Sequence, residues 1–227
     1  MCEDKSIPQH VVILGGSGQV ATALKERLKL KGIKVSLLGT SSENDFFCDL
    51  RDAASIKRAS ESVDQFDGLV LNAKKDIVKP IQYRDYSEIN ECLQVGISGP
   101  LYFIGQSIKE KKLMNGASIV SIGSQSQLSG LKYSVDYCAV KSALHGMNKS
   151  LIKEFARKKI RSNTVIFDWI DDGDLPRDSE RLGANDVSGF ANPYEASFPI
   201  EFLLSSKSRW ISGQSLLFDG GRFLSRL

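Results

Sequence analysis

Short apolar runs alternate along this chain with longer stretches in which apolar side chains recur at helical spacing. The short runs are rich in β-branched residues, which is typical of buried strands. They predict strands over residues 10–14, 33–38, 45–48, 68–71, 117–122, 161–167 and 214–218. The longer stretches have the pattern of amphipathic helices. They predict helices over residues 21–30, 53–63, 86–112, 135–159 and 193–205.

This alternation of strands and helices predicts the fold class. Parallel strands need crossover connections, and a helix between two strands provides one. We therefore expect an α/β protein with a Rossmann-type doubly wound parallel sheet, in a single domain over residues 1–227. Gly99-Pro100 is expected to interrupt the long helix. Residues 171–192 show no periodicity, and we expect a substrate lid there.

Composition points to an ordinary soluble protein. The chain has 227 residues, of which 41% are hydrophobic and 25% are charged. No apolar run is long enough to span a membrane, and acids stand near the start where a secretory signal would be basic and then apolar. We therefore expect a cytoplasmic protein. The net charge of +3 is small and its basic residues are interleaved with acids, which disfavours nucleic acid as a partner.

Cysteine and histidine usage disfavours several chemistries. The four cysteines are scattered and form no Cys-x-x-Cys pair, which fits a reducing compartment and indicates no structural zinc. The two histidines, His10 and His145, are far apart and differ in context. A histidine-based metal site or a Ser-His-Asp hydrolase is therefore poorly supported, and we expect no metal.

A glycine turn follows the first predicted strand and leads into the first helix. It reads Gly15-Gly16-Ser17-Gly18-Gln19-Val20-Ala21. Glycines let the backbone approach a pyrophosphate, and the first N–H groups of the helix face it. A strand, a glycine turn and a helix in this order predict the front of a dinucleotide site.

The end of the second predicted strand bears on the choice of dinucleotide. An acid there would bind the ribose hydroxyls of NAD, but the chain has Gly39 followed by Thr40, Ser41 and Ser42. Hydroxyl groups can bond a 2′-phosphate that an acid would repel, so the pattern favours NADP(H) over NAD(H). A plain turn and helix cap is the alternative reading of these three residues.

Candidate acid/base chemistry lies after the fifth predicted strand. Tyr137 and Lys141 are four residues apart on a predicted helix, so their side chains share one face. A nearby ammonium favours the phenolate, and we therefore expect Lys141 to lower the pKa of Tyr137. Ser124, on the exit loop of the strand, can bond the same substrate oxygen.

These motifs together resemble the short-chain dehydrogenase/reductase family from Val11 to about Gly221. The matching residues, in the order and at the intervals of the family, are the glycine turn, Asp49-Leu50, Asn72-Ala73, Ser124, Tyr137-x-x-x-Lys141, Asn163-x-Val165, and Gly213-Gln214 with Asp219-Gly220-Gly221.

The resemblance implies a role for each matching residue. Tyr137 is the implied acid/base, Lys141 lowers its pKa and holds the nicotinamide ribose, and Ser124 orients the substrate oxygen. The implied cofactor contacts are Gly15, Ser17, Gly18, Gln19 and Val20 at the pyrophosphate and adenosine, Asp49 and Leu50 at the adenine, Asn72 and Ala73 along the adenine ribose, and Ile170 at the carboxamide. The resemblance also implies a homodimer or homotetramer.

Three positions depart from the pattern of the family. Gly96 stands where the family has its proton-relay asparagine. Phe167-Asp168 replaces the Pro-Gly that usually follows the sixth strand, and Lys74 replaces the glycine after Asn-Ala. These changes surround an intact Ser-Tyr-Lys set.

The leading hypothesis is an NADP(H)-dependent oxidoreductase that reduces a carbonyl, or oxidises a secondary alcohol, as its small-molecule substrate. A second hypothesis keeps the cofactor as a retained redox partner in an epimerase or dehydratase. A third is a non-catalytic subunit that senses nucleotide, and it is motivated by Gly96 and the altered turn. The sequence does not identify the substrate.

Overall fold

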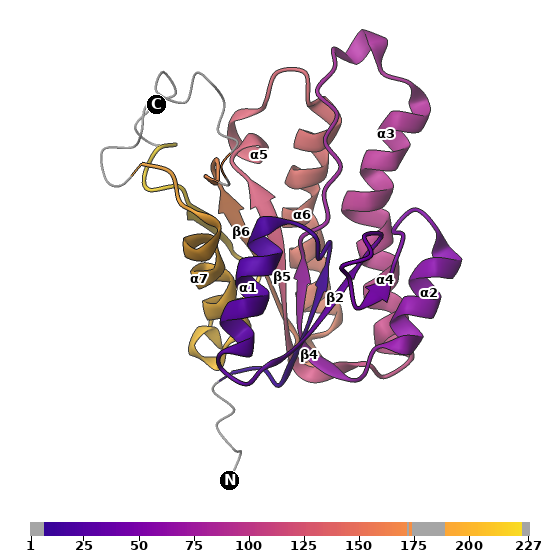
Figure 1. Ribbon diagram of the computed structural model, residues 1–227, viewed down its shortest axis with the longest axis vertical. Coiled ribbons are helices and arrows are strands. Elements are labelled where there is room, and N and C mark those ends of the chain that lie inside the picture. The colour runs from indigo at the N-terminus through magenta and orange to yellow at the C-terminus, as the bar shows by residue number, and fades with distance from the viewer. Residues whose placement is uncertain (1–6, 172, 174–188, 224–227) are drawn as a thin grey trace.

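One seven-stranded sheet forms the centre of the computed structural model, which describes residues 7–171, 173 and 189–223 (Figure 1). Every pair of neighbouring strands is parallel. The strands lie in the order β3-β2-β1-β4-β5-β6-β7. Their bounds are β1 His10–Leu14, β2 Lys34–Gly39, β3 Phe46–Phe47, β4 Phe66–Leu71, β5 Leu113–Ser124, β6 Arg161–Phe167 and β7 Ser215–Phe218.

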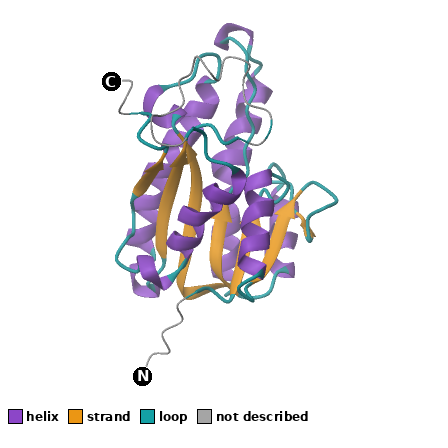
Figure 2. Ribbon diagram, turned by 60° about the vertical axis from the view of Figure 1, so that its left-hand side comes forward, coloured by secondary structure: helices purple, strands orange, loops and turns teal. Residues whose placement is uncertain are grey.

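Helices cover both faces of this sheet (Figure 2). Helices α1 (Gln19–Lys29) and α7 (Pro193–Leu204) pack together on one face with one apolar cluster. Helices α2 (Ala53–Ser62), α4 (Gly99–Lys109) and α6 (Val135–Glu154) bury a second cluster on the other. The predicted doubly wound α/β fold is confirmed. Among the described helices, none has both the length and the apolar character that crossing a membrane requires.

Shorter helices complete the described part of the chain. They are α3 Tyr86–Leu93, α5 Ser126–Ser129, and the 3-10 turns η1 Ile81–Tyr83, η3 Ala156–Lys158 and η4 Ser206–Ser208. The turn η3 and a left-handed residue, Lys159 with φ 56°, end the helical stretch that the sequence predicted to run to residue 159.

The strand order changes direction between β1 and β4, which are neighbours at the centre of the sheet. After β1 the chain crosses on the α1 face, and after β4 it crosses on the opposite face. The two loops therefore diverge at the carboxyl ends of these strands and leave a crevice between them. Ligands of open α/β sheets bind at this kind of switch point.

The long predicted helix is continuous, but one turn of it is widened. A π turn, η2 (Gln94–Ser98), joins α3 to α4. Pro100 has no N–H to donate to the carbonyl of Gly96, and the N–H of Gly99 donates to Gln94, five residues back. The interruption predicted at Gly99-Pro100 thus takes the form of a π turn, and the helix ends at Lys109.

The π turn packs tightly against α6 at Gly96. A Cβ atom added to Gly96 would lie 2.2 Å from Cγ1 of Val140, which is buried on α6. Glycine is therefore the residue that fits here with Val140 in place. An asparagine at this position, as in the family pattern, would need α6 or Val140 to move.

We expect Gly96→Ala to destabilise the fold by about 1–3 kcal/mol, because its methyl group overlaps Val140. Urea unfolding checks this. The matched control is Gly105→Ala on α4, where nothing lies within 4 Å of an added Cβ, and we expect it to be neutral or stabilising. The double variant Gly96→Ala/Val140→Ala should recover part of the loss. A Gly96→Ala protein as stable as the control would contradict the overlap.

Candidate active site

A cavity of about 1010 Å³ lies at the carboxyl ends of the central strands. Residues that follow β1, β2, β3, β4, β5 and β6 all contribute to its wall. Most of the residues singled out from the sequence line it, namely Gly15, Ser17, Gly18, Gln19, Val20, Thr40, Asp49, Leu50, Asn72, Ala73, Ser124, Tyr137, Lys141 and Ile170. The fold therefore brings segments from most of the chain together around one space.

The glycine turn forms one end of this cavity. Gly15 has φ +85°, and an added Cβ would lie 2.5 Å from the backbone of Ala73, so both the conformation and the space require glycine. The side-chain amide of Asn72 donates to the carbonyl of Gly15 over 2.7 Å. This bond joins the loop after β1 to the loop after β4 across the switch point. Gly18 is the N-cap residue of α1, and a Cβ added there would have only the Asn72 side-chain nitrogen within 4 Å, at 3.6 Å.

Tyr137 and Ser124 meet at another part of the cavity. Ser124 ends β5, and Tyr137 lies in the first turns of α6. Ser124 lies close enough to Tyr137 to favour the charged form of the phenol, and the Ser124 hydroxyl accepts from the Ser126 hydroxyl over 2.9 Å. Two hydroxyl groups from different elements thus face one point, as a site that binds a single substrate oxygen requires.

Lys141 is buried beneath this pair. Its ammonium donates to the carbonyl of Ile122 over 2.7 Å and lies 5.6 Å from the centre of the Tyr137 ring. Burial, and after it the charge of Lys74, lower the pKa of Lys141 to about 8. Lys74, one of the departures from the family pattern, is thus an electrostatic neighbour of the site.

The expected lowering of the Tyr137 pKa is wrong in direction. Burial raises the pKa of Tyr137 to about 12, and the hydrogen bond from Ser124 opposes this rise only in part. The sequence shows that Tyr137 and Lys141 share a helix face, but it does not show how deeply the phenol is buried. Desolvation disfavours the charged form of either group, so the pKa of Tyr137 rises, the pKa of Lys141 falls, and the two values move apart.

The three hydroxyl residues after β2 separate in the structure. Thr40 lines the cavity, whereas Ser41 and Ser42 do not. Ser41 forms a turn, because its hydroxyl accepts from the N–H of Glu43 and its carbonyl accepts from Asn44. The turn reading therefore accounts for Ser41, and Thr40 alone remains at the cavity.

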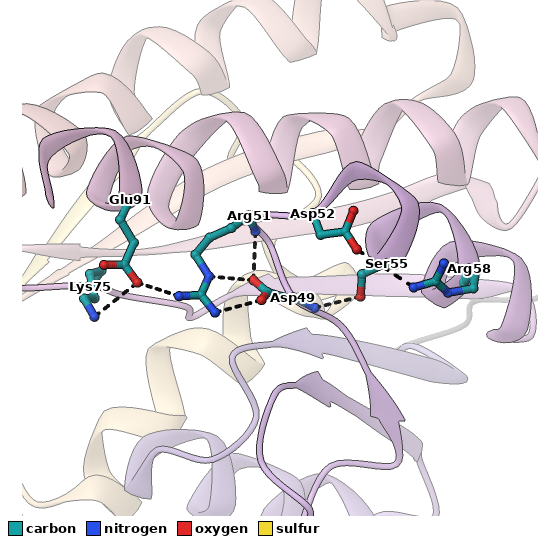
Figure 3. Close-up of polar contacts among 7 residues, drawn as sticks. All are labelled: Asp49, Arg51, Asp52, Ser55, Arg58, Lys75 and Glu91. Atoms are coloured by element: carbon teal, nitrogen blue, oxygen red, sulfur yellow. Dashed lines mark hydrogen bonds and ion pairs between the residues drawn. The ribbon is translucent and has the colours of Figure 1, made fainter. Parts of the chain in front are cut away.

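Asp49 lies at the cavity wall within a chain of charged groups (Figure 3). Arg51 donates to its carboxylate through Nε over 2.9 Å and Nη2 over 2.7 Å, and its backbone N–H donates over 3.0 Å. Arg51 also donates to Glu91 of α3 over 2.7 Å, and Glu91 pairs with Lys75 at 3.2 Å. Three segments of the wall, after β3, after β4 and on α3, are joined in this way.

The comparison with known proteins gives consistent matches over most of the chain. A family model described as enoyl-(acyl carrier protein) reductase matches residues 20–222. D-threitol dehydrogenase of Mycolicibacterium smegmatis is 24% identical, over 92% of this chain and 91% of that protein. The 3-oxoacyl-(acyl-carrier-protein) reductase of Aquifex aeolicus is 27% identical, over 94% of this chain and 87% of that protein. The chain belongs to the short-chain dehydrogenase/reductase family.

Solved structures share the fold of this chain. A short-chain dehydrogenase/reductase of Brucella melitensis has a TM-score of 0.85 at 21% identity, with 94% of this chain and 96% of that chain covered. A blue fluorescent protein from a metagenomic library, solved in complex with NADPH, has a TM-score of 0.85 at 22% identity, with 94% and 97% covered. The resemblance seen in the motifs is confirmed, and an oxidoreductase activity follows at the level of the family.

The short-chain dehydrogenase/reductase site has charged residues that the motifs did not reveal. Arg51, Lys75 and Glu91 all line the cavity. Arg51 stands two residues after Asp49, so the sequence could have predicted that it lies near that carboxylate. Glu91 lies 40 residues further along the chain, and only the fold brings it to Arg51.

The altered turn after β6 also borders the site. Phe167, Asp168, Trp169 and Ile170 line the cavity. Ile170 forms a parallel bridge with Ala191, and the N–H of Asp171 donates to the carbonyl of Ala191 over 2.8 Å. Of the lid predicted over 171–192, residues 172 and 174–188 lie outside the described part of the chain.

We expect Arg51→Met to raise the pKa of Asp49, which the Arg51 guanidinium now holds below its usual range. Removal of the hydrogen bonds to the carboxylate favours its protonated form. Carboxyl-carbon NMR titration of Asp49 measures the change. The matched control is Lys57→Met, which removes the exposed Lys57–Glu61 pair on α2 and should leave Asp49 unaltered. An unchanged Asp49 titration in Arg51→Met would show that Arg51 does not set it.

Proposed function

We propose that this short-chain dehydrogenase/reductase is an NADP(H)-dependent enzyme that reduces a carbonyl, or oxidises a secondary alcohol, through Ser124, Tyr137 and Lys141. The observation that carries the proposal is the placement of Ser124 and Tyr137 together in the wall of the same cavity as a glycine turn. One part of the cavity suits a phosphate-bearing cofactor, and the other suits the oxygen of a substrate.

The residues at the glycine turn fit a dinucleotide. Gly15 lets the turn pack against the backbone of Ala73, and Gly18 and the start of α1 lie beside it with backbone N–H groups of a helix terminus. NADP(H), when bound, would give or take the hydride. Gly15, Ser17, Gly18, Gln19 and Val20 would hold its pyrophosphate and adenosine, Asp49 and Leu50 its adenine, Asn72 and Ala73 its adenine ribose, and Ile170 its carboxamide.

Proton handling belongs to the chain's own residues. With a pKa of about 12, Tyr137 keeps its proton at neutral pH and can donate it from Oη to a substrate oxygen held by Ser124. The Lys141 ammonium, held at Ile122 below the ring, favours the phenolate that is left. In alcohol oxidation the same phenolate would accept the proton. Gly96 supplies no side chain to a proton relay, so re-protonation would use another route.

The preference for NADP(H) rests on the end of β2. Of Thr40, Ser41 and Ser42, only Thr40 lines the cavity. No acid stands at this position. A 2′-phosphate could accept a hydrogen bond from its hydroxyl without repulsion. In an NAD enzyme, an acid at this place would bind the free 2′-hydroxyl instead.

Two relatives indicate substrates to try first. One is named for 3-oxoacyl carrier-protein thioesters and another for D-threitol. A 3-oxoacyl thioester carries a carbonyl that can be reduced, and D-threitol carries secondary alcohols that can be oxidised. These are the two directions of the reaction that Ser124 and Tyr137 would support. Acetoacetyl-CoA with NADPH and D-threitol with NADP⁺ are therefore suitable first assays.

Assembly into a homo-oligomer is part of the proposal. Apolar side chains remain on the outer sides of the long helix and of the Tyr137 helix, where Leu93, Leu101, Tyr102 and Val135 are each 38–55% exposed. Contact with a second copy of the chain would cover them.

We expect Tyr137→Phe to lower the kcat of carbonyl reduction about 10²–10⁴-fold, because it removes the proton donor. Steady-state assays with NADPH and acetoacetyl-CoA measure this. Tyr102→Phe, on the outer side of α4, is the matched control and should retain full activity. Equal activity of Tyr137→Phe and Tyr102→Phe would refute the role of Tyr137.

For the wild type, kcat/KM should fall above pH about 8, where Lys141 loses its charge while Tyr137 stays protonated.

We expect Thr40→Asp to reverse the cofactor preference, since the new carboxylate repels a 2′-phosphate and can bind a 2′-hydroxyl. Titration with NADPH and NADH, followed by quenching of Trp169 at the cavity, measures both affinities. Wild type should bind NADPH at least about tenfold more tightly, a difference of about 1.4 kcal/mol. Ser42→Asp is the matched control, because Ser42 is exposed and does not line the cavity. A reversal produced equally by Ser42→Asp would contradict the assignment to Thr40.

A further inference from the structure

A buried ion pair lies directly behind the turn that departs from the family pattern. Nη1 of Arg222 is 2.9 Å from Oδ2 of Asp168. The side chain of Arg222 is 2% exposed and that of Asp168 is 8% exposed. Charged side chains are seldom so deeply buried, and each depends on its partner to offset the loss of hydration.

Arg222 contacts a second segment as well. Its guanidinium lies over the ring of Phe190, 4.4 Å from the ring centre. The residue is placed by the turn that follows β7, in which the carboxylate of Asp219 accepts from the N–H groups of Gly221 over 2.9 Å and Phe223 over 2.7 Å. The guanidinium therefore occupies a fixed position between Asp168 and Phe190.

These two contacts flank the short bridge that borders the cavity. Asp168 is two residues before Ile170, and Phe190 directly precedes Ala191, the bridge partner of Ile170. The Asp171 N–H to Ala191 carbonyl bond, at 2.8 Å, closes the same bridge. Arg222 thus holds both sides of the bridge from a point behind the cavity wall.

The need for such a contact follows from the sequence of the turn. A Pro-Gly turn keeps its shape because proline restricts the backbone. Phe167-Asp168 has no such restriction, so the path of residues 168–170 depends on contacts with other segments. The ion pair with Arg222 is one such contact.

We propose that Arg222 is a positioning residue that, through its ion pair with Asp168, fixes the 168–170 segment for the nicotinamide half of the cofactor. This inference rests on the proposed NADP(H) function. It assigns Arg222 no contact with the adenosine half, because the glycine turn and the Asp49 segment stand on other strands of the sheet.

The test compares a whole cofactor with its adenosine half. Calorimetric titrations with NADPH and with 2′,5′-ADP are run on wild type and on Arg222→Met. We expect NADPH affinity to fall at least about tenfold in Arg222→Met, and 2′,5′-ADP affinity to stay within about twofold. A loss of overall structure would instead weaken both ligands together.

The matched control is Arg27→Met. Arg27 makes the same kinds of contact, an ion pair with Glu201 and a stack 4.1 Å from the centre of the Phe198 ring, but it joins α1 to α7 away from the cavity. It should lower stability without separating the two affinities. Should Arg222→Met not fold, the neutral pair Asp168→Asn/Arg222→Gln leaves no unpaired buried charge and replaces it in the same comparison.

The outcomes distinguish the two levels of the proposal. If wild type binds neither NADPH nor 2′,5′-ADP, the proposed function fails, and with it this inference. If wild type binds both, and the Arg222 variants bind both as wild type does or lose both equally, the inference is overturned and the proposed function stands. A selective loss of NADPH, absent from Arg27→Met, supports the positioning role.

Discussion

The bond between the Lys141 ammonium and the carbonyl of Ile122 is the contact on which the rest of the site depends. It fastens the middle of α6 to the end of β5, two elements that the chain reaches through a loop and a short helix. Because the charge is buried, it has few other partners and the bond fixes the distance between helix and strand. Ser124 is two residues beyond Ile122, and Tyr137 is one helical turn before Lys141. One hydrogen bond therefore sets the meeting of the two hydroxyls.

Around that fixed point, the wall of the cavity is assembled from strand-end loops that are joined by polar side chains. Asn72 connects the loops after β1 and β4, Arg51 connects the β3 loop to α3, and Arg222 connects the turns after β6 and β7. In a parallel sheet all these loops emerge at one edge, where their backbone groups have no neighbouring strand. Side-chain bonds between loops hold the loops in place where the hydrogen bonds of the sheet have ended. The sheet therefore sets where each loop starts, and the contacts between loops set the shape of the cavity.

Much of this arrangement could be predicted from the sequence, for a physical reason. Strand and helix periodicity reflects burial on one side of an element, so the alternation and the parallel sheet follow from it. Glycine at position 15 and the spacing of Tyr137 and Lys141 are local requirements, and the sequence reports those directly. The pKa of Tyr137 depends on depth in the folded molecule, and its predicted direction was wrong for that reason. Partners such as Glu91 for Arg51, or Arg222 for Asp168, are distant in sequence and carry no local signal.

The close approach of Gly96 to Val140 has a consequence for how this chain can change over evolution. The two positions belong to different helices and form an epistatic pair. A side chain is gained at position 96 with less strain after position 140 has become smaller, because the reverse order passes through a destabilised intermediate. The route from Gly96 to a larger side chain is therefore ordered, with the substitution at position 140 first.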